Sequence, residues 1–217
     1  MEIESECTHA VIMEAVRKYL PHGGKILDIG SGRGELMGML VNAGYEVIGC
    51  DIDEECVSLS ERYGETRQLD IKDISKDTFG FRFDCVLLSH VLEHLENPRE
   101  SLIQLASVSK GLIVLSLPNP YDSLSVLRAL VRRNIEYMNE GHLVIWDWSH
   151  LKTFIEKGCD MEILEFFYDS VSVPLPHKVR RFLGNKGLLY SLESKYLRAL
   201  FPRFCRSITV AINSKTS

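Results

Sequence analysis

Three glycines at alternating positions, Gly30, Gly32 and Gly34, follow the apolar run KILDI in the sequence KILDIGSGRGE. Glycine accepts backbone angles that other residues avoid, and it lets a ligand come close to the main chain. The dinucleotide-binding pattern is GxGxxG, with a diphosphate at the N-terminus of the following helix. Here the spacing is GxGxG and the acidic Glu35 follows at once, which disfavours a phosphate. The turn predicts a phosphate-free or cationic ligand; the alternative is a tight turn without a ligand.

Two carboxylates follow the next two strand-like runs. Asp51 ends GYEVIGCD, and a carboxylate at that position can accept hydrogen bonds from both hydroxyls of a ribose. Asp70 and Ile71 end TRQLDI, where the acid would accept from an adenine amino group and the isoleucine would pack on the ring. Each aspartate alone is more often a helix cap or a solvated charge. Their occurrence on successive strands favours a nucleoside ligand.

The elements that must position these residues follow from the hydrophobic pattern. Strand-like runs alternate with helix-spaced segments, and the runs are KILDI, YEVIGCD, TRQLDI, FDCVLLSH, GLIVLSLP, DMEILEFFY and RSITVAIN. Strands separated by helices predict right-handed crossovers and a mostly parallel α/β sheet. In such a sheet, ligands bind at the carboxyl ends of the strands, where the strand order reverses. We therefore expect the glycine turn and the two carboxylates at that edge.

Two intervals, 119–141 and 172–206, are too long for connecting loops, and both have helix-like spacing of apolar residues. We expect a single domain over 1–217, in which these intervals are helical insertions that form a lid over the active site. The second interval holds eight Lys or Arg residues against one acid, Glu193, although the whole chain has a net charge of −5. This surplus favours an anionic acceptor or peripheral contact with an anionic membrane. The alternative is that these cations solvate a helix whose apolar stripe is buried.

Composition excludes several classes of protein. No apolar run approaches the roughly 20 residues of a membrane span, and the acidic N-terminus lacks the basic flank of a signal peptide. The six cysteines have no CxxC spacing. We therefore expect reduced thiols in a cytoplasmic protein, without a disulfide framework or a metal site. The negative net charge and the lack of a binding module disfavour nucleic acid as a partner.

The segments LDIGSGRGE, GCDID, LDI and FDCVLLSHVLEHLENP, in this order, resemble the class I S-adenosylmethionine-dependent methyltransferases of the small-molecule type. The later segment GHLVIWDWSHLKTFIEKGCDMEILE is also similar to theirs, so the resemblance covers roughly residues 22–118 and 141–167. It implies a Rossmann-like, doubly wound, mostly parallel seven-stranded sheet with an antiparallel last strand. It also implies transfer of a methyl group from S-adenosylmethionine to a small-molecule acceptor.

The resemblance also implies which residues bind the cofactor. In chain order they are Asp28, Gly30, Ser31, Gly32, Gly34, Asp51, Ile52, Asp70, Ile71 and Ser89. The glycine turn and the aspartate before it would hold the methionine half. The end of the second strand would hold the ribose, and the end of the third would meet the adenine. Ser89 would border the sulfonium and the methyl group.

Methyl transfer from a sulfonium is an in-line displacement, in which the protein must align two reactants and exclude water. An oxygen acceptor often also needs a general base. Histidine titrates near neutral pH, so His90 and His142 are the candidate catalytic residues. We expect Glu93 and His94 in VLEHL to support the structure, and His150 to lie at the surface near a helix start.

Two other functions fit parts of the pattern. A nicotinamide-dependent oxidoreductase would use the same fold, but the GxGxG spacing and the acid after it oppose a diphosphate. A non-catalytic module that keeps the cofactor fold for regulation or assembly would show a degraded cofactor motif, and this motif is intact. A methyltransferase is therefore the first hypothesis.

Overall fold

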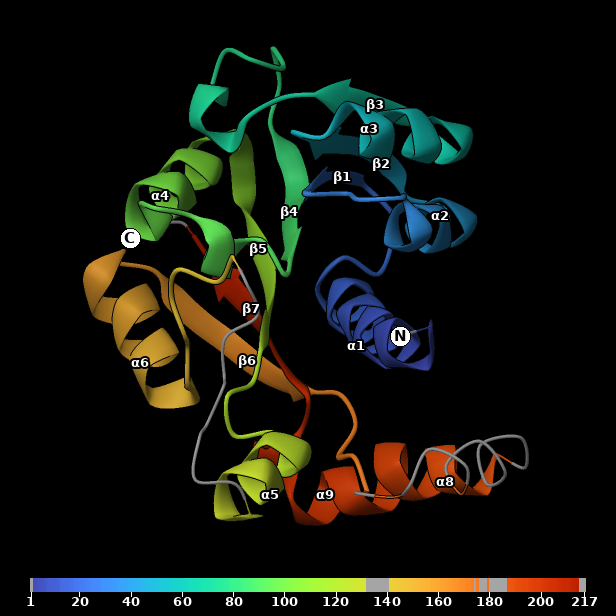
Figure 1. Ribbon diagram of the computed structural model, residues 1–217. Coiled ribbons are helices and arrows are strands. Elements are labelled where there is room, and N and C mark those ends of the chain that lie inside the picture. Colours follow the sequence, from blue (N-terminus) through green and yellow to red (C-terminus); the bar gives the residue numbers. More distant parts are fainter. Residues whose placement is uncertain (1, 132–140, 174, 176–178, 180–186, 215–217) are drawn as a thin grey trace.

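The computed structural model describes residues 2–131, 141–173, 175, 179 and 187–214. Its strands are β1 (Lys25–Ile29), β2 (Glu46–Asp51), β3 (Glu65–Gln68), β4 (Phe83–Ser89), β5 (Ser109–Pro118), β6 (Glu162–Tyr168) and β7 (Ser207–Asn213). They form one sheet in the order β3-β2-β1-β4-β5-β7-β6 (Figure 1). β1 to β5 are parallel, whereas β7 runs antiparallel to both of its neighbours. The strand order reverses between β1 and β4, which creates a crevice at their carboxyl ends. The predicted fold is confirmed.

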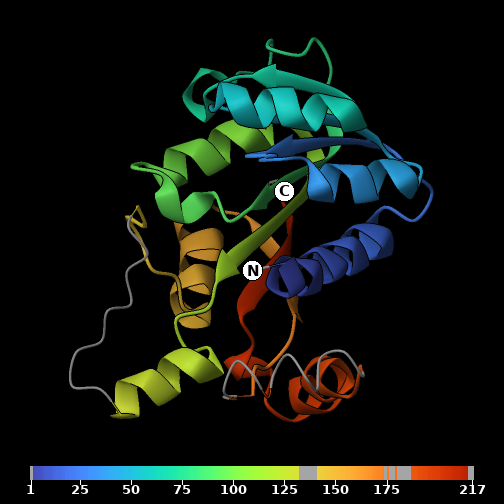
Figure 2. The same cartoon turned by 45° about the vertical axis from the view of Figure 1, so that its right-hand side comes forward.

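Helices cover both faces of the sheet (Figures 1 and 2). They are α1 (Glu2–Tyr19), α2 (Glu35–Asn42), α3 (Glu54–Ser60), α4 (Pro98–Val108), α5 (Ser123–Val131), α6 (Trp148–Thr153), α8 (Leu188–Ser191) and α9 (Arg198–Leu200). Leu87 and Leu88 are successive residues of β4, so their side chains enter opposite cores. Leu87 packs in the core with Ile12 of α1, and Leu88 packs with Leu102 of α4. Burial of both faces explains why β4 reads as a continuous apolar run.

The predicted third strand ends earlier than TRQLDI suggests. β3 stops at Gln68, and Asp70 instead caps a short helical turn by accepting a hydrogen bond from Lys72 N at 2.9 Å. Ile71 turns inward and is 8% exposed. Asp70 and Ile71 therefore lie beyond the strand, at the edge where the sequence places them.

The two long intervals contribute helices at one end of the molecule. α5 follows β5, and α8 and α9 precede β7, and Figures 1 and 2 both show these helices beyond the same end of the sheet. Residues 132–140, 174, 176–178 and 180–186 of these intervals lie outside the described residues. The lid function of both intervals stays a prediction. No helix among the described ranges is long and apolar enough to span a membrane.

Candidate functional site

The glycine turn between β1 and α2 packs tightly on the segment that follows β4. Gly30 has φ 68° and Gly34 has φ 82°, angles that favour glycine. A Cβ atom on Gly30 would lie 2.3 Å from Cγ2 of Val91, so no larger residue fits without movement. The turn is thus held against the segment that follows β4, and Gly30 lines the cavity at the carboxyl edge of the sheet.

The end of β2 fixes this turn. The carbonyl of Cys50 accepts hydrogen bonds from Gly30 N at 2.8 Å and from Ser31 N at 3.1 Å. Oδ2 of Asp51 accepts from Gly32 N at 2.8 Å, and Oδ1 accepts from Asp53 N at 3.0 Å. A carboxylate has about four lone-pair positions. Asp51 therefore orders the turn and keeps acceptor capacity for a ligand.

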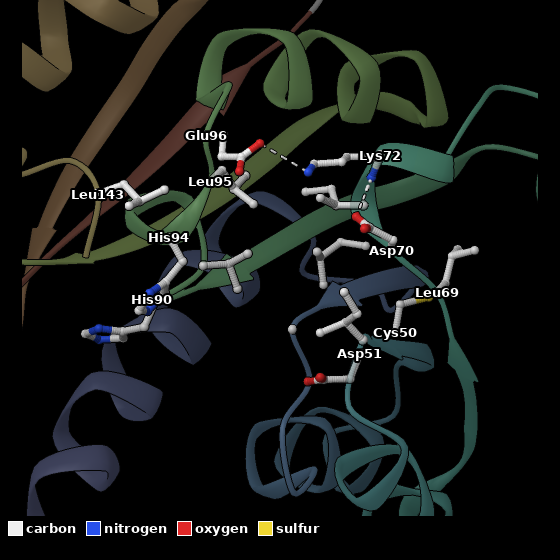
Figure 3. A pocket seen from close by; sticks show the side chains of 15 residues that line it. Cys50, Asp51, Leu69, Asp70, Lys72, His90, His94, Leu95, Glu96 and Leu143 are labelled. Carbon is white, nitrogen blue, oxygen red and sulfur yellow. Dashed lines mark hydrogen bonds and ion pairs between the residues drawn. The ribbon is translucent and has the colours of Figure 1, made fainter. Parts of the chain in front are cut away.

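A cavity of about 500 Å³ lies at the carboxyl ends of β1, β2 and β4 (Figure 3). The predicted residues that line it are Gly30, Asp51, Ile52, Asp70, Ile71 and His90. Sequence reasoning did not assign its other lining residues, which are Ile29, Cys50, Leu69, Lys72, Val91, His94, Leu95, Glu96 and Leu143. Asp28, Ser31, Gly32, Gly34, Ser89 and His142 are predicted site residues that do not line it. Figure 3 shows His90 and His94 on one side of the cavity and Asp51 and Asp70 on the other.

The cavity combines apolar walls with an acidic rim. Asp51, Asp70 and Glu96 face it with one cation, Lys72, whose Nζ lies 3.4 Å from Oε2 of Glu96. Ile52 is 67% exposed although it is a large apolar residue, so a flat ligand ring packed on it would be favourable. The lining suits a ligand with hydroxyl or amino donors and an aromatic ring, and it opposes a diphosphate.

Two buried polar groups under the turn lack partners within the described part of the chain. Oδ2 of Asp28 and Oγ of Ser31 are buried and accept or donate no hydrogen bond there. Burial, followed by the nearby Asp51 charge, raises the pKa of Asp28 to about 7. An unpaired buried carboxylate is costly. A ligand ammonium would supply the missing partner, so these residues fit a cationic amino-acid group.

His90 stands where β4 ends, in a left-handed backbone conformation that is uncommon for a residue other than glycine. Its φ is 57°, and its backbone N donates to the carbonyl of Ser116 at 2.8 Å. Strained backbone of this kind clusters at functional sites. The imidazole lies between Oε1 of Glu93, 3.4 Å from Nδ1, and Oγ of Ser207, 3.5 Å from Nε2. Ser89 precedes it and lies outside the cavity.

Polar residues that sequence reasoning missed continue from His90 away from the cavity. Oγ of Ser207 lies 3.2 Å from Oγ1 of Thr8, which donates to Oδ2 of Asp169 at 3.1 Å. Asp169 is 2% exposed, and burial raises the pKa of its carboxyl group, although Arg206 N and Ser207 N donate to it. An aspartate directly after a strand was the available signal, because Asp169 follows β6 as Asp51 ends β2.

Two further histidines, His94 and His142, lie next to each other. The rings of His94 and His142 are 4.8 Å apart, and Nδ1 of His94 lies 2.9 Å from the carbonyl oxygen of Gly141. Burial lowers the pKa of His142. His94, expected to be structural, also lines the cavity, whereas the expected surface position of His150 is confirmed by a side chain 80% exposed beside Asp147.

A second cavity, of about 810 Å³, lies near the helices of the long intervals. Its lining residues are Tyr121, Asp147, Trp148, Ser149, Lys152, Arg203 and Phe204. The Arg203 guanidinium lies 5.0 Å from the ring centre of Trp148, and that ring stacks on Phe166 at 4.9 Å. Among the described residues that line it, the two cations outnumber the one acid, Asp147, whose carboxylate already contacts Ser149 N and His150, so with its aromatic walls this cavity suits an anionic or aromatic molecule.

Comparison with known proteins identifies one family and several solved structures with the same fold. Residues 4–158 match a family model described as a methyltransferase domain. A ubiquinone biosynthesis O-methyltransferase of Coxiella burnetii is 30% identical over 95 residues, which are 41% of this chain and 40% of that protein. The chain thus spans less than half of that relative.

Two solved structures share the fold along almost the whole chain. Magnesium protoporphyrin IX methyltransferase from Synechocystis PCC 6803, with bound SAH, has a TM-score of 0.65 and 18% identity, and the match covers 98% of this chain and 84% of that one. The plantazolicin methyltransferase in complex with SAH has a TM-score of 0.66 and 19% identity, with 99% and 87% covered. At such identities the likeness concerns the fold.

Proposed function

Because the chain belongs to the methyltransferase domain family, we propose that it transfers a methyl group from S-adenosylmethionine to a small-molecule acceptor. The observation that carries the proposal is the pairing of an acid-lined nucleoside-sized cavity with a buried carboxylate oxygen behind the glycine turn, Oδ2 of Asp28, which has no hydrogen-bond partner among the described residues. These groups favour a ligand that is cationic and free of phosphate. S-adenosylmethionine supplies an activated methyl group on a positively charged sulfur.

Different residues of this chain would bind different parts of the cofactor. Asp28 and Ser31 would hold the ammonium of the methionine half, since both have unpaired buried oxygens. Asp51 would accept from the ribose with the lone pairs that Gly32 N and Asp53 N leave free. Asp70 would accept from the adenine edge, and the ring would cover the exposed side chain of Ile52, with Ile71 beside it. Ser89, which precedes His90 at the end of β4, would border the sulfonium and the methyl group.

His90 is proposed as the general base for a hydroxyl acceptor. It lies on the cavity wall, and its strained backbone and two neighbours fix the ring. With Nδ1 toward Glu93, Nε2 is the proposed basic nitrogen, and its 3.5 Å contact with Oγ of Ser207 would give way to the acceptor hydroxyl whose proton it takes. His142 is the second predicted catalytic residue and lies beside His94.

The acceptor is proposed to be an anionic or aromatic small molecule bound under the lid. The second cavity supports this, because Lys152 and Arg203 line it together with Tyr121 and Trp148. Charge-assisted hydrogen bonds from the two cations would orient a carboxylate or phosphate group. Replacing Arg203 with Gln should raise the KM for such an acceptor and leave cofactor affinity unchanged.

Peripheral contact with an anionic membrane is proposed for interval 172–206. Between α8 and α9 the chain forms a π-helical segment, Leu192–Leu197, so that helical structure continues to Leu200 as the last helical segment. Leu192, Tyr196 and Leu200 recur there every fourth residue, and they are 41%, 65% and 70% exposed. This apolar stripe lies within the interval of strong positive charge. The test is co-sedimentation with phosphatidylglycerol or phosphatidylcholine vesicles. Binding to the anionic vesicles that Leu200→Glu abolishes would support it, and equal behaviour in both lipids would refute it.

Calorimetric titration with S-adenosylhomocysteine and with NAD, followed by incubation with radiolabelled methyl donor and fractionated cell extract, tests the proposal. We expect saturable binding of S-adenosylhomocysteine alone, and label in a small-molecule fraction. Asp51→Ala is the matched negative control. Binding of NAD instead would refute the proposed function, and cofactor binding without transfer to any fraction would favour a regulatory module.

A further inference from the structure

A buried carboxylate and two imidazoles converge beside the cofactor cavity. Glu93, His94 and His142 each offer one ligand atom, and these atoms all lie within 4.8 Å of one another. Glu93 is 1% exposed, and neither of its carboxylate oxygens has a hydrogen-bond partner in the described part of the chain. The imidazole of His90 also lies beside it, with Nδ1 3.4 Å from Oε1.

A carboxylate buried in this way needs a positive partner, because the loss of its hydration costs several kcal/mol unless a cation or donors replace the water. The candidate positive partners beside Glu93 are protonated imidazoles or a bound metal ion. Three imidazoles around one carboxylate would repel one another if all were protonated. A single divalent ion, by contrast, is attracted by the carboxylate and bound by neutral imidazoles.

The main chain holds this cluster together across a long sequence separation. The carbonyl of Glu93 accepts hydrogen bonds from Leu143 N at 2.8 Å and Val144 N at 3.2 Å. The same segment returns the carbonyl of Gly141 to Nδ1 of His94, at 2.9 Å. In that arrangement Nδ1 carries the proton and the lone pair of His94 is on Nε2. A backbone carbonyl that orients an imidazole is the usual outer-shell partner of a metal-binding histidine.

We propose that Glu93, His94 and His142 bind one divalent transition-metal ion of the Zn²⁺ type. Two histidines and one glutamate are the ligand set of zinc sites that keep an open coordination position. Mg²⁺ and Ca²⁺ prefer oxygen ligands, so they are disfavoured here. His142 would then be a ligand instead of a base.

The position of the proposed metal site indicates how a bound ion would take part in methyl transfer. His94 lines the cofactor cavity, and His90 stands between the cavity and Glu93. An acceptor oxygen on the open coordination position would lie near both, and the metal would lower the pKa of a bound hydroxyl. This use rests on the proposed function, whereas metal binding itself does not.

Calorimetry and absorption spectroscopy of the full chain test the site. The protein is freed of metal by dialysis against a chelator and titrated with Zn²⁺, Co²⁺ and Mg²⁺. We expect one Zn²⁺ or Co²⁺ per chain, visible Co²⁺ absorption bands of a nitrogen–oxygen site, and no competition from Mg²⁺. Glu93→Gln keeps the shape of the side chain, and His142→Ala removes a partly exposed ligand. Each variant should bind at least about tenfold more weakly, because even outer-shell changes cost that much.

His150→Ala is the matched control, since His150 is exposed and lies outside the cluster. It should bind metal like the wild type. Absence of stoichiometric metal binding by the wild type, or unchanged binding in a folded Glu93→Gln or His142→Ala variant, would overturn the site. Titration of the same samples with S-adenosylhomocysteine separates the two proposals. A protein that binds metal but not S-adenosylhomocysteine would refute the proposed function and leave the proposed metal site standing.

Discussion

Replacement of Gly30 with alanine tests how tightly the cofactor turn is packed. The new Cβ would meet Cγ2 of Val91 at 2.3 Å, far inside van der Waals contact, and the φ of 68° would be kept by a residue that avoids it. The left-handed backbone costs about 1–2 kcal/mol, and overpacking costs about 1–3 kcal/mol. We therefore expect Gly30→Ala to lower the free energy of unfolding by about 2–5 kcal/mol.

Gly32 provides the matched control. Its φ is 54°, but nothing lies within 4 Å of the position that a Cβ would take. Gly32→Ala should therefore lose only the backbone part, about 1–2 kcal/mol. In a double-mutant cycle, Val91→Ala removes the clashing methyl group and leaves Cβ of Val91 at an ordinary 3.7 Å. Val91→Ala should thus rescue Gly30→Ala by about 1–3 kcal/mol and should not rescue Gly32→Ala.

Urea unfolding followed by circular dichroism measures these differences. Equal stability loss in the two glycine variants, or no coupling between positions 30 and 91, would refute the close approach of the turn to the segment after β4. A fall in affinity for S-adenosylhomocysteine in Gly30→Ala that Val91→Ala restores would link the same packing to cofactor binding.

Three further changes test the roles of single residues. Because burial raises the pKa of Asp28 to about 7, the folded state holds a proton that the unfolded state releases near pH 4. The free energy of unfolding should therefore fall as pH rises from about 4 to 7, by up to about 4 kcal/mol, and chemical denaturation of Asp28→Asn should not show this fall. Asp51→Ala should weaken S-adenosylhomocysteine binding in calorimetry by roughly 1–3 kcal/mol; near-unchanged affinity in a folded variant would count against the ribose contact. His90→Asn, which tolerates the left-handed φ, should lower the single-turnover methylation rate of a hydroxyl acceptor about 10²–10⁴-fold at constant cofactor affinity, and an unchanged rate would exclude His90 as the base.

The predicted site residues that line the cavity are those set by local pattern. Gly30, Asp51 and Asp70 each lie at or just after a strand end, and the common direction of the parallel strands brings them to one edge. The family model confirms the resemblance, and the sheet order confirms the fold. The local sequence pattern does not predict contacts between residues that are far apart in the chain. Ser207 meets His90 because β7 returns antiparallel beside β5, and Asp169 joins this group through its hydrogen bond from Ser207 N.

The same limit explains why Glu93 was read as structural. Within VLEHL it is an acid in an apolar turn, and no local signal shows that residues 141–144 fold back on its carbonyl. The role of the basic interval was equally open, because exposure of Leu192, Tyr196 and Leu200 depends on which face of the last helical segment packs inward.

Asp28 and Glu93 share one physical feature that joins the two proposed binding events. Both carboxylates are almost fully buried, and each has an oxygen without a hydrogen-bond partner in the ranges that the structure describes. Carboxylates of this kind reduce the stability of the ligand-free fold, since their hydration is lost and not replaced. They lie near the two strands, β1 and β4, between which the strand order reverses. Under the two proposals, a cationic cofactor would compensate the first and a metal ion the second, so each ligand would relieve the cost of one buried carboxylate and raise the stability of the bound form.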